Sequence, residues 1–208
     1  MTSPTNLKRD PTQRFYQSHS QAYADATSVR ALADVLLEFT QRLPVDGCVL
    51  DLGCGAGHDL SSIAATGRLG IGLDYAEPIV QIARSISSCP VVVGDMRSIP
   101  LANHAFAGVW ASASLLHLPI RDVPTAFSEI RRVLQPGGHF FASVKVGSGE
   151  MRDKEGRFFT LYQKDSWRHL LQESGFTILS LEYNEAAAPS PPGSRSERWL
   201  NSLSTISS

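Results

Sequence analysis

The chain has 208 residues, of which 42% are hydrophobic and 19% charged, and its formal net charge at pH 7 is -1. This composition predicts a folded globular protein, and the length suits one domain, residues 1–208, with a single substantial core. The near-neutral charge and the lack of a basic block argue against nucleic acid as a partner.

The three cysteines, Cys48, Cys54 and Cys89, show no paired spacing. This argues against a disulfide framework and a structural zinc site, and we expect no metal. The N-terminus lacks the apolar core of a signal peptide, and no apolar run approaches the roughly 20 residues that span a bilayer. We therefore expect a cytoplasmic protein with no membrane partner, as a monomer or homodimer.

The N-terminal region divides into two parts. Residues 1–13 are polar, contain two prolines and are expected to be disordered. Residues 14–45 are expected to form a helical cap, because apolar residues recur at helical spacing from Gln21 to Gln41. This predicted helix ends before Pro44.

Short apolar runs and helical stretches then alternate along the chain. The runs are 48–53, 69–74, 91–95, 106–112 and 139–146, and helices are predicted to begin near Ala56, Glu77 and Val123. Strands so uniformly apolar must be covered on both faces, which predicts a parallel sheet built from right-handed strand-helix-strand units.

The C-terminal part completes this α/β fold. A helix is predicted over Lys164 to Ser174, a sixth strand over 176–183, a loop over 186–194, and a last strand over 197–206 that runs antiparallel beside the sixth. The prediction is a doubly wound, mostly parallel seven-stranded sheet with helices on both faces.

Three glycines, Gly53, Gly55 and Gly57, follow the first strand. Without a Cβ the backbone can turn tightly and approach a ligand, and the next helix begins with free N–H groups that suit an anionic group. The spacing is G-x-G-x-G, and His58 stands where a dinucleotide fingerprint has its third glycine.

Carboxylates follow the second and third strands. Asp74 lies 21 residues beyond Gly53, where a side chain can accept hydrogen bonds from both ribose hydroxyls; a helix N-cap is the alternative. Tyr75 could pack on an adenine. Asp95 could accept from the adenine amino group and the Met96 N–H could donate to a ring nitrogen, although a turn explains "GD" equally well.

The motifs "VLDLGCGAG", "GLDYAE", "GDMRSIPL", "FAGVWASASLLHLP" and "EIRRVLQPGGHFFASVK" occur in this order. From about Tyr16 to Phe176 the chain resembles the class I S-adenosylmethionine-dependent methyltransferases, with a Rossmann-like fold. It is most similar to the small-molecule group that includes the ubiquinone and menaquinone biosynthetic enzymes. The resemblance implies S-adenosyl-L-methionine as cofactor, S-adenosyl-L-homocysteine as product, and a small-molecule acceptor.

The resemblance also implies roles for the residues at the strand ends. The three glycines would lie under the methionine part of the cofactor, with Asp51 helping to place its ammonium group. Asp74 would bind the ribose, and Asp95 with Met96 would frame the adenine. Ala111 and Ser112, which end the fourth strand, would lie beside the methionine moiety.

Candidates for the acceptor side lie in three segments. His117 is the candidate general base, with local packing as the alternative. Tyr16 and Tyr23 are candidates for closing the pocket and shielding the sulfonium. The connection 147–162 is expected to be an acceptor-side loop, with three candidate contacts: Arg157, Phe159 and Tyr162.

Other functions stay open at this point. An RNA- or protein-directed methyltransferase remains an alternative, because its acceptor surface would lie in the segments whose sequence is least informative. A nucleotide-dependent oxidoreductase is disfavoured by His58, and a cofactor-binding protein without turnover is compatible with the same glycines.

Overall fold

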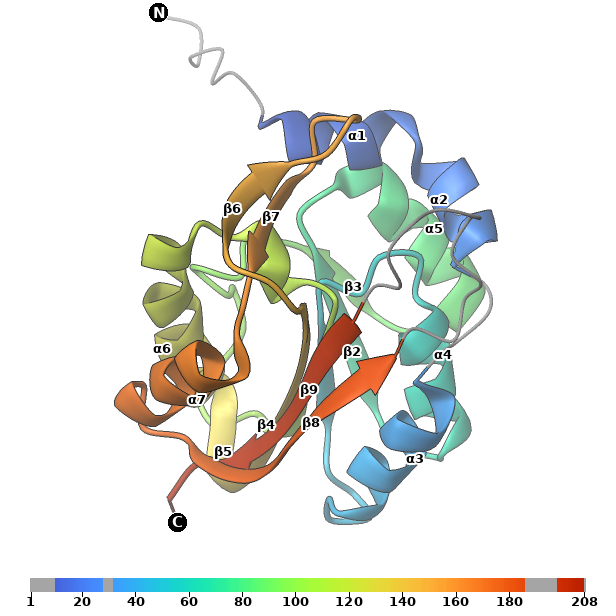
Figure 1. Cartoon of the computed structure of the whole chain (residues 1–208). Helices are drawn as coiled ribbons and strands as arrows, with labels where there is room; N and C mark the ends of the chain where they lie inside the picture. The colour runs from blue at the N-terminus through green and yellow to red at the C-terminus, as the bar shows by residue number, and fades with distance from the viewer. Residues whose placement is uncertain (1–9, 28–31, 186–197, 208) are drawn as a thin grey trace, which may run out of the picture.

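The computed structural model describes residues 10–27, 32–185 and 198–207 (Figure 1). At its centre is a seven-stranded sheet of order β3-β2-β1-β4-β5-β9-β8. Its strands are Val49–Leu52 (β1), Gly70–Asp74 (β2), Val91–Val93 (β3), Phe106–Ser112 (β4), Leu134–Lys145 (β5), Thr177–Glu185 (β8) and Arg198–Thr205 (β9). Strands β1 to β5 pair in parallel, and β9 runs antiparallel to both β5 and β8. The predicted fold class is confirmed, including the antiparallel last strand.

Helices cover both faces of the sheet, as the apolar strands require (Figure 1). One face carries α3 (Ala33–Gln41), α4 (His58–Ala65) and α5 (Glu77–Ser87), and the other carries α6 (Val123–Val133) and α7 (Lys164–Glu173). Side chains of β1 alternate between them, because Val49 packs with Phe39 of α3 while Leu50 packs in the cluster of α6. The hydrophobic core therefore has two layers, one on each face of the sheet.

The sequence of α6 shows why this helix packs as it does. Val123, Phe127 and Ile130 recur at helical spacing on one face, and all three are fully buried. The Phe127 ring lies 5.8 Å from that of Phe140 on β5 and 5.5 Å from that of Trp167 on α7, measured between ring centroids. These contacts hold both helices against the sheet.

The N-terminal region differs from its prediction in two ways. Asp10 to Gln13 do not belong to a disordered segment, because α1 begins at Pro11 and extends to Ser18, with the Asp10 carboxylate accepting the Thr12 N–H as a cap. The single helix predicted from Gln21 to Gln41 is wrong: α2 (Ser20–Ala26) and α3 are separate. Residues 1–9 and 28–31 lie outside the described residues.

The predicted loop 147–162 contains a β-hairpin instead. Strands β6 (Gly149–Arg152) and β7 (Phe158–Leu161) pair antiparallel, and the two central residues of β7, Phe159 and Thr160, are buried. The Phe158 N–H donates to Thr12 Oγ1 at 2.9 Å, so the hairpin is joined to α1 at the carboxyl edge of the sheet (Figure 1). The predicted loop 186–194 lies outside the described residues.

Candidate functional site

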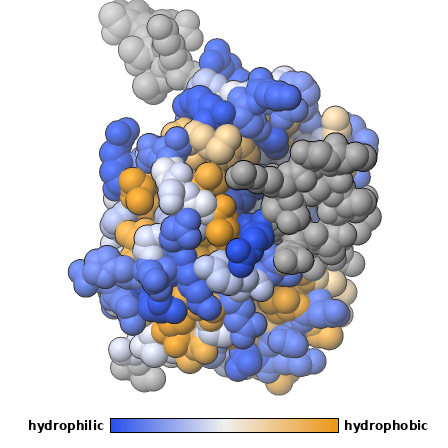
Figure 2. All heavy atoms as spheres, in the orientation of Figure 1, coloured by the Kyte–Doolittle hydropathy of each residue, from blue (hydrophilic) through white to orange (hydrophobic). Residues whose placement is uncertain are grey.

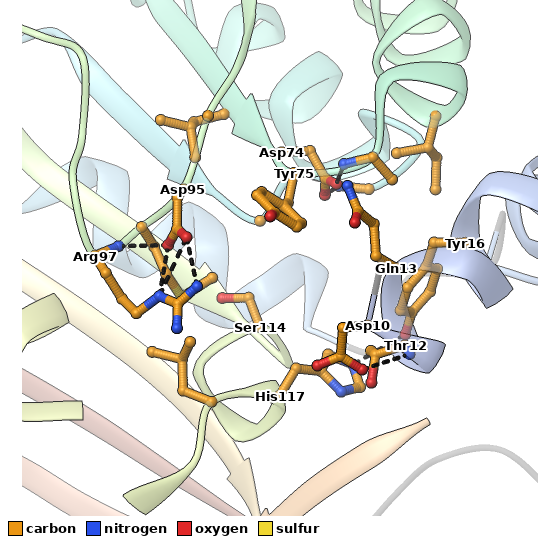
Figure 3. Close-up of a pocket in the computed structure, with 18 of the residues that line it drawn as sticks. Asp10, Thr12, Gln13, Tyr16, Asp74, Tyr75, Asp95, Arg97, Ser114 and His117 are labelled. Atoms are coloured by element: carbon orange, nitrogen blue, oxygen red, sulfur yellow. Dashed lines mark hydrogen bonds and ion pairs between the residues drawn. The ribbon is translucent and has the colours of Figure 1, made fainter. Parts of the chain in front are cut away.

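A cavity of about 350 Å³ lies at the carboxyl ends of β1, β2 and β4, and α1 and α2 form its opposite wall (Figure 3). This volume is in the range of small-molecule sites, and the position is the one expected for ligands of open parallel sheets. The predicted residues on the cavity wall are Tyr16, Tyr23, Gly53, Gly55, Asp74, Tyr75, Asp95, Met96, Ser112 and His117.

Six predicted residues do not lie on this wall: Asp51, Gly57, Ala111, Arg157, Phe159 and Tyr162. Each has a physical reason to face elsewhere. Ala111 is fully buried inside the sheet, one residue out of phase with Ser112. Gly57 precedes α4 and faces α5, where a Cβ would lie 2.9 Å from the carbonyl oxygen of Ala83.

Asp51, on β1, is buried just before the glycine turn that leads into α4. The backbone of Leu60 hydrogen-bonds to its carboxylate, but Oδ2 finds no partner among the described residues. Burial raises its pKa well above the usual value, and repulsion from Asp59 and Asp74 adds to this. A cation close to Asp51 would stabilise its buried carboxylate charge, yet the Asp51 side chain does not lie on the cavity wall.

Asp74 ends β2 and links the cavity to the glycine turn. Its two oxygens accept the N–H groups of Gly55 and Ala76, each at 3.0 Å. Burial raises the pKa of Asp74, and these hydrogen bonds oppose the shift. The Tyr75 backbone also hydrogen-bonds to this carboxylate, and because a carboxylate has about four lone-pair positions, Asp74 retains room for a ligand hydroxyl. Tyr75 is half exposed beside it.

An ion-pair cluster that the sequence did not indicate lies at the end of β3. The Arg97 guanidinium contacts the Asp95 carboxylate at 2.6 Å and that of Asp122 at 2.9 Å. Burial alone would raise the pKa of Asp95, but the hydrogen bonds from Arg97 outweigh it and lower the pKa. Asp95 is therefore an anion with part of its hydrogen-bonding capacity already used.

Ser114 is a second residue that the sequence interpretation missed. Ser114 follows β4 after Ala113, whose φ is +52°. Its Cβ lies so close to Gly53 that a Cβ added at Gly53 would be only 2.3 Å from it. The side chain lies on the cavity wall (Figure 3), is almost completely buried, and its Oγ has no hydrogen-bond partner among the described residues. Such a group is costly unless a ligand satisfies it.

Tyr16, Tyr23 and His117 form the end of the cavity under α1. The Tyr16 hydroxyl lies 2.9 Å from His117 Nε2, and the rings of Tyr16 and Tyr23 meet edge to face at 5.1 Å. His117 Nδ1 lies 2.7 Å from the Phe158 carbonyl oxygen. Burial lowers the pKa of His117 to about 4, so the ring is neutral at pH 7. Burial raises the pKa of Tyr16 to about 12.

The hairpin residues predicted to bind an acceptor have structural contacts instead. Arg157 pairs with Asp153 at 2.7 Å and its guanidinium lies 4.7 Å from the centre of the Phe15 ring. Phe159 is buried against His117, with ring centroids 4.9 Å apart. Tyr162 is buried beside Trp167. None of these three side chains lies on the cavity wall, and Phe159 and Tyr162 pack into the core.

The charge of the cavity wall is negative. Its described residues include four carboxylates, of Asp10, Asp74, Asp95 and Asp122, and two guanidinium groups, of Arg97 and Arg121. Such a wall favours a ligand that carries positive charge and disfavours an anion.

Within residues 10–27, 32–185 and 198–207, no group of three or more His, Cys, Asp or Glu side chains could hold a metal ion. In the same part of the chain no helix combines the length and apolar character needed to cross a membrane. Figure 2 shows polar and apolar side chains mixed on the face it presents.

Comparison with known proteins relates the chain to methyl-transferring proteins. Residues 49–138 match the family described as "Methyltransferase domain". An O-methyltransferase of Pyrenophora dematioidea is 31% identical over 63% of the chain and 54% of its own length, so the chain spans about half of that relative. The methyltransferase GfsG of Streptomyces halstedii is 28% identical over 84% of the chain and 71% of that protein.

A solved structure has the same fold. It is the 1,6-didemethyltoxoflavin-N1-methyltransferase of Burkholderia thailandensis with bound 1,6-didemethyltoxoflavin and S-adenosylhomocysteine. The TM-score is 0.74 at 18% identity, over 94% of the chain and 85% of that protein.

Proposed function

Because the chain belongs to the class I S-adenosylmethionine-dependent methyltransferases, we propose that it transfers the methyl group of S-adenosylmethionine to a small-molecule acceptor. The family prediction is confirmed. The acceptor class is our proposal, and it rests on how polar groups are distributed along the cavity.

The observation that carries the proposal is that the two ends of the cavity differ in chemistry. Asp74 and Asp95 line one end, and Tyr16 and His117 line the other (Figure 3). The first end has carboxylates for ribose hydroxyls and an adenine amino group. The second end carries a phenol hydroxyl and a neutral imidazole with the Asp10 carboxylate nearby, which suits a small acceptor that is not an anion beside the transferred methyl group.

The cofactor fits the residues that are present. Asp74 retains acceptor capacity for a ribose hydroxyl, and the negative wall complements a sulfonium. Ser114 lies beside Gly53, and its buried hydroxyl, which has no hydrogen-bond partner in the described part of the chain, is available to a ligand in the cavity. When bound, S-adenosylmethionine supplies a methyl group already activated by positively charged sulfur.

The chain's own contribution to catalysis is then position and exclusion of water. Tyr16 and Tyr23 of the N-terminal helices lie over the strand ends and enclose the cavity. Alignment of the reacting groups can lower a barrier by about 7–11 kcal/mol in favourable cases. The negative wall also argues against a polyanionic acceptor such as RNA. These features support a small-molecule acceptor.

Calorimetric titration of the purified chain tests the proposal. We expect S-adenosylhomocysteine to bind and NAD(H) not to bind, and Asp74→Ala should abolish or strongly weaken the binding. Asp165→Ala is the matched control, because that carboxylate is exposed on α7, far along the chain from the cavity residues. Binding of NAD(H) alone, or unchanged affinity in a folded Asp74→Ala variant, would refute the proposal.

A further inference from the structure

The hydrogen bonds around His117 run in one direction. A carbonyl oxygen only accepts, so Nδ1 of His117 carries the ring hydrogen and donates it to Phe158. In a neutral imidazole the other nitrogen is then unprotonated. Nε2 therefore accepts the hydrogen of the Tyr16 hydroxyl, 2.9 Å away.

Arg157 imposes the same direction on Tyr16. Burial raises the pKa of the Tyr16 hydroxyl, while the Arg157 guanidinium hydrogen-bonds to it and opposes that rise. A guanidinium has no acceptor, so Arg157 can only donate to the phenol oxygen. Of these two neighbours His117 alone can take the phenol hydrogen. One lone pair of the Tyr16 oxygen is left for the cavity, on whose wall Tyr16 lies (Figure 3).

We infer that Tyr16 recognises the methyl acceptor by accepting a hydrogen bond from it, and that His117 is a positioning residue that fixes Tyr16 in this state. The acceptor is accordingly a neutral group that carries its own hydrogen, an O–H or N–H, and not a carboxylate. This inference rests on the proposed function, and it replaces the predicted role of His117 as a direct base.

Two observations support the choice of a neutral acceptor. His117 Nε2 is occupied by the Tyr16 hydroxyl and is not open to an acceptor proton. Arg157, the cation among the predicted acceptor contacts, is engaged by Asp153 and Glu155 and is not on the cavity wall. The wall's carboxylates outnumber its guanidinium groups, which disfavours an anion further.

Phenol and its methyl ether anisole test the recognition step, added separately to the complex with S-adenosylhomocysteine. The ratio of phenol affinity to anisole affinity should be about fivefold higher in the wild type than in Tyr16→Phe, because the variant loses one hydrogen bond to phenol. Tyr183→Phe is the matched control, because this tyrosine is exposed on β8 and is not on the cavity wall, and it should keep the wild-type ratio. Equal ratios in the wild type and Tyr16→Phe, or no binding of either probe, would overturn the inference.

His117 variants distinguish positioning from packing. In His117→Gln the amide oxygen can still accept from Tyr16, so the wild-type ratio should be retained. In His117→Leu the phenol hydrogen is released and can reach the anisole oxygen, so the ratio should fall. A fall of the phenol-to-anisole affinity ratio in both variants, or in neither variant, would contradict the positioning role.

The ring tautomer is measured independently by nitrogen-15 NMR of the free protein at pH 7. The hydrogen of His117 should be on Nδ1, and a hydrogen on Nε2 would overturn the inference. If S-adenosylhomocysteine does not bind the wild type, the proposed function fails, while the tautomer still decides whether the hydrogen-bond chain exists.

Discussion

Substitution of Gly57 by alanine should destabilise the fold through the contact between α4 and α5. Gly57 has φ +83°, and a Cβ there would lie 2.9 Å from the oxygen and 3.0 Å from the Cα of Ala83. A non-glycine residue in this conformation costs roughly 1–2 kcal/mol. Forcing a carbon into packed backbone costs typically a further ~1–3 kcal/mol. We therefore expect a loss of about 2–5 kcal/mol.

Gly67→Ala provides the matched control. Gly67 has almost the same backbone conformation, φ +82°, but a Cβ there would meet nothing within 4 Å. It should lose only the conformational part, roughly 1–2 kcal/mol. The difference between the two variants isolates the packing cost of Gly57 against α5.

Urea unfolding of the two variants and the wild type measures this difference, provided that the slope m is unchanged. Equal losses of unfolding free energy would refute the packing argument. A folded Gly57→Ala variant should also bind S-adenosylhomocysteine with wild-type affinity, because Gly57 is not on the cavity wall. If Gly57→Ala bound S-adenosylhomocysteine more weakly without losing stability, Gly57 would contact the ligand, as the family resemblance implies.

Three further predictions concern single cavity residues. Asp74→Asn should lower the affinity for S-adenosylhomocysteine at least about tenfold in calorimetry, because an amide cannot accept the same charge-assisted hydrogen bonds. Ser114→Ala should leave the free energy of unfolding of the free protein unchanged or higher, since its hydroxyl has no partner among the described residues. The same variant should bind S-adenosylhomocysteine more weakly, and a destabilised free protein would contradict the assignment. The lowered pKa of His117, about 4 against 6.5, contributes stability that is full above about pH 6.5 and is lost as the pH falls towards 4. Urea unfolding at pH 7 and pH 4.5 should show this loss of unfolding free energy in the wild type, about 3 kcal/mol when complete, and should not show it in His117→Gln. The same pH dependence in the wild type and in the variant would refute the prediction.

The strands and the ligand end of the sheet could be predicted because their signals are local. The run Val49–Leu52 is buried throughout, so its composition alone requires helices on both faces. Asp74 stands at the end of such a run, and parallel strands bring their carboxyl ends to one edge. The family resemblance rests on the motifs at these strand ends, which are local as well.

Side-chain direction was less accessible to sequence interpretation. Ala111 and Ser112 were predicted together, but only Ser112 lies on the cavity wall, and Ala111 is fully buried within β4. Ser114 carried no local signal in the sequence, because its direction depends on the positive φ of Ala113.

The acceptor end of the cavity was decided only by tertiary structure. Tyr16 and His117 are 101 residues apart in sequence, and the Phe158 carbonyl is 41 residues beyond His117. Their contact depends on how α1 and the hairpin settle on the sheet edge, through bonds such as that between Phe158 and Thr12. Sequence pattern determines which residues form each element, because that depends on neighbours along the chain. Which polar atoms meet, and which of them donates the hydrogen, depends on packing between distant elements.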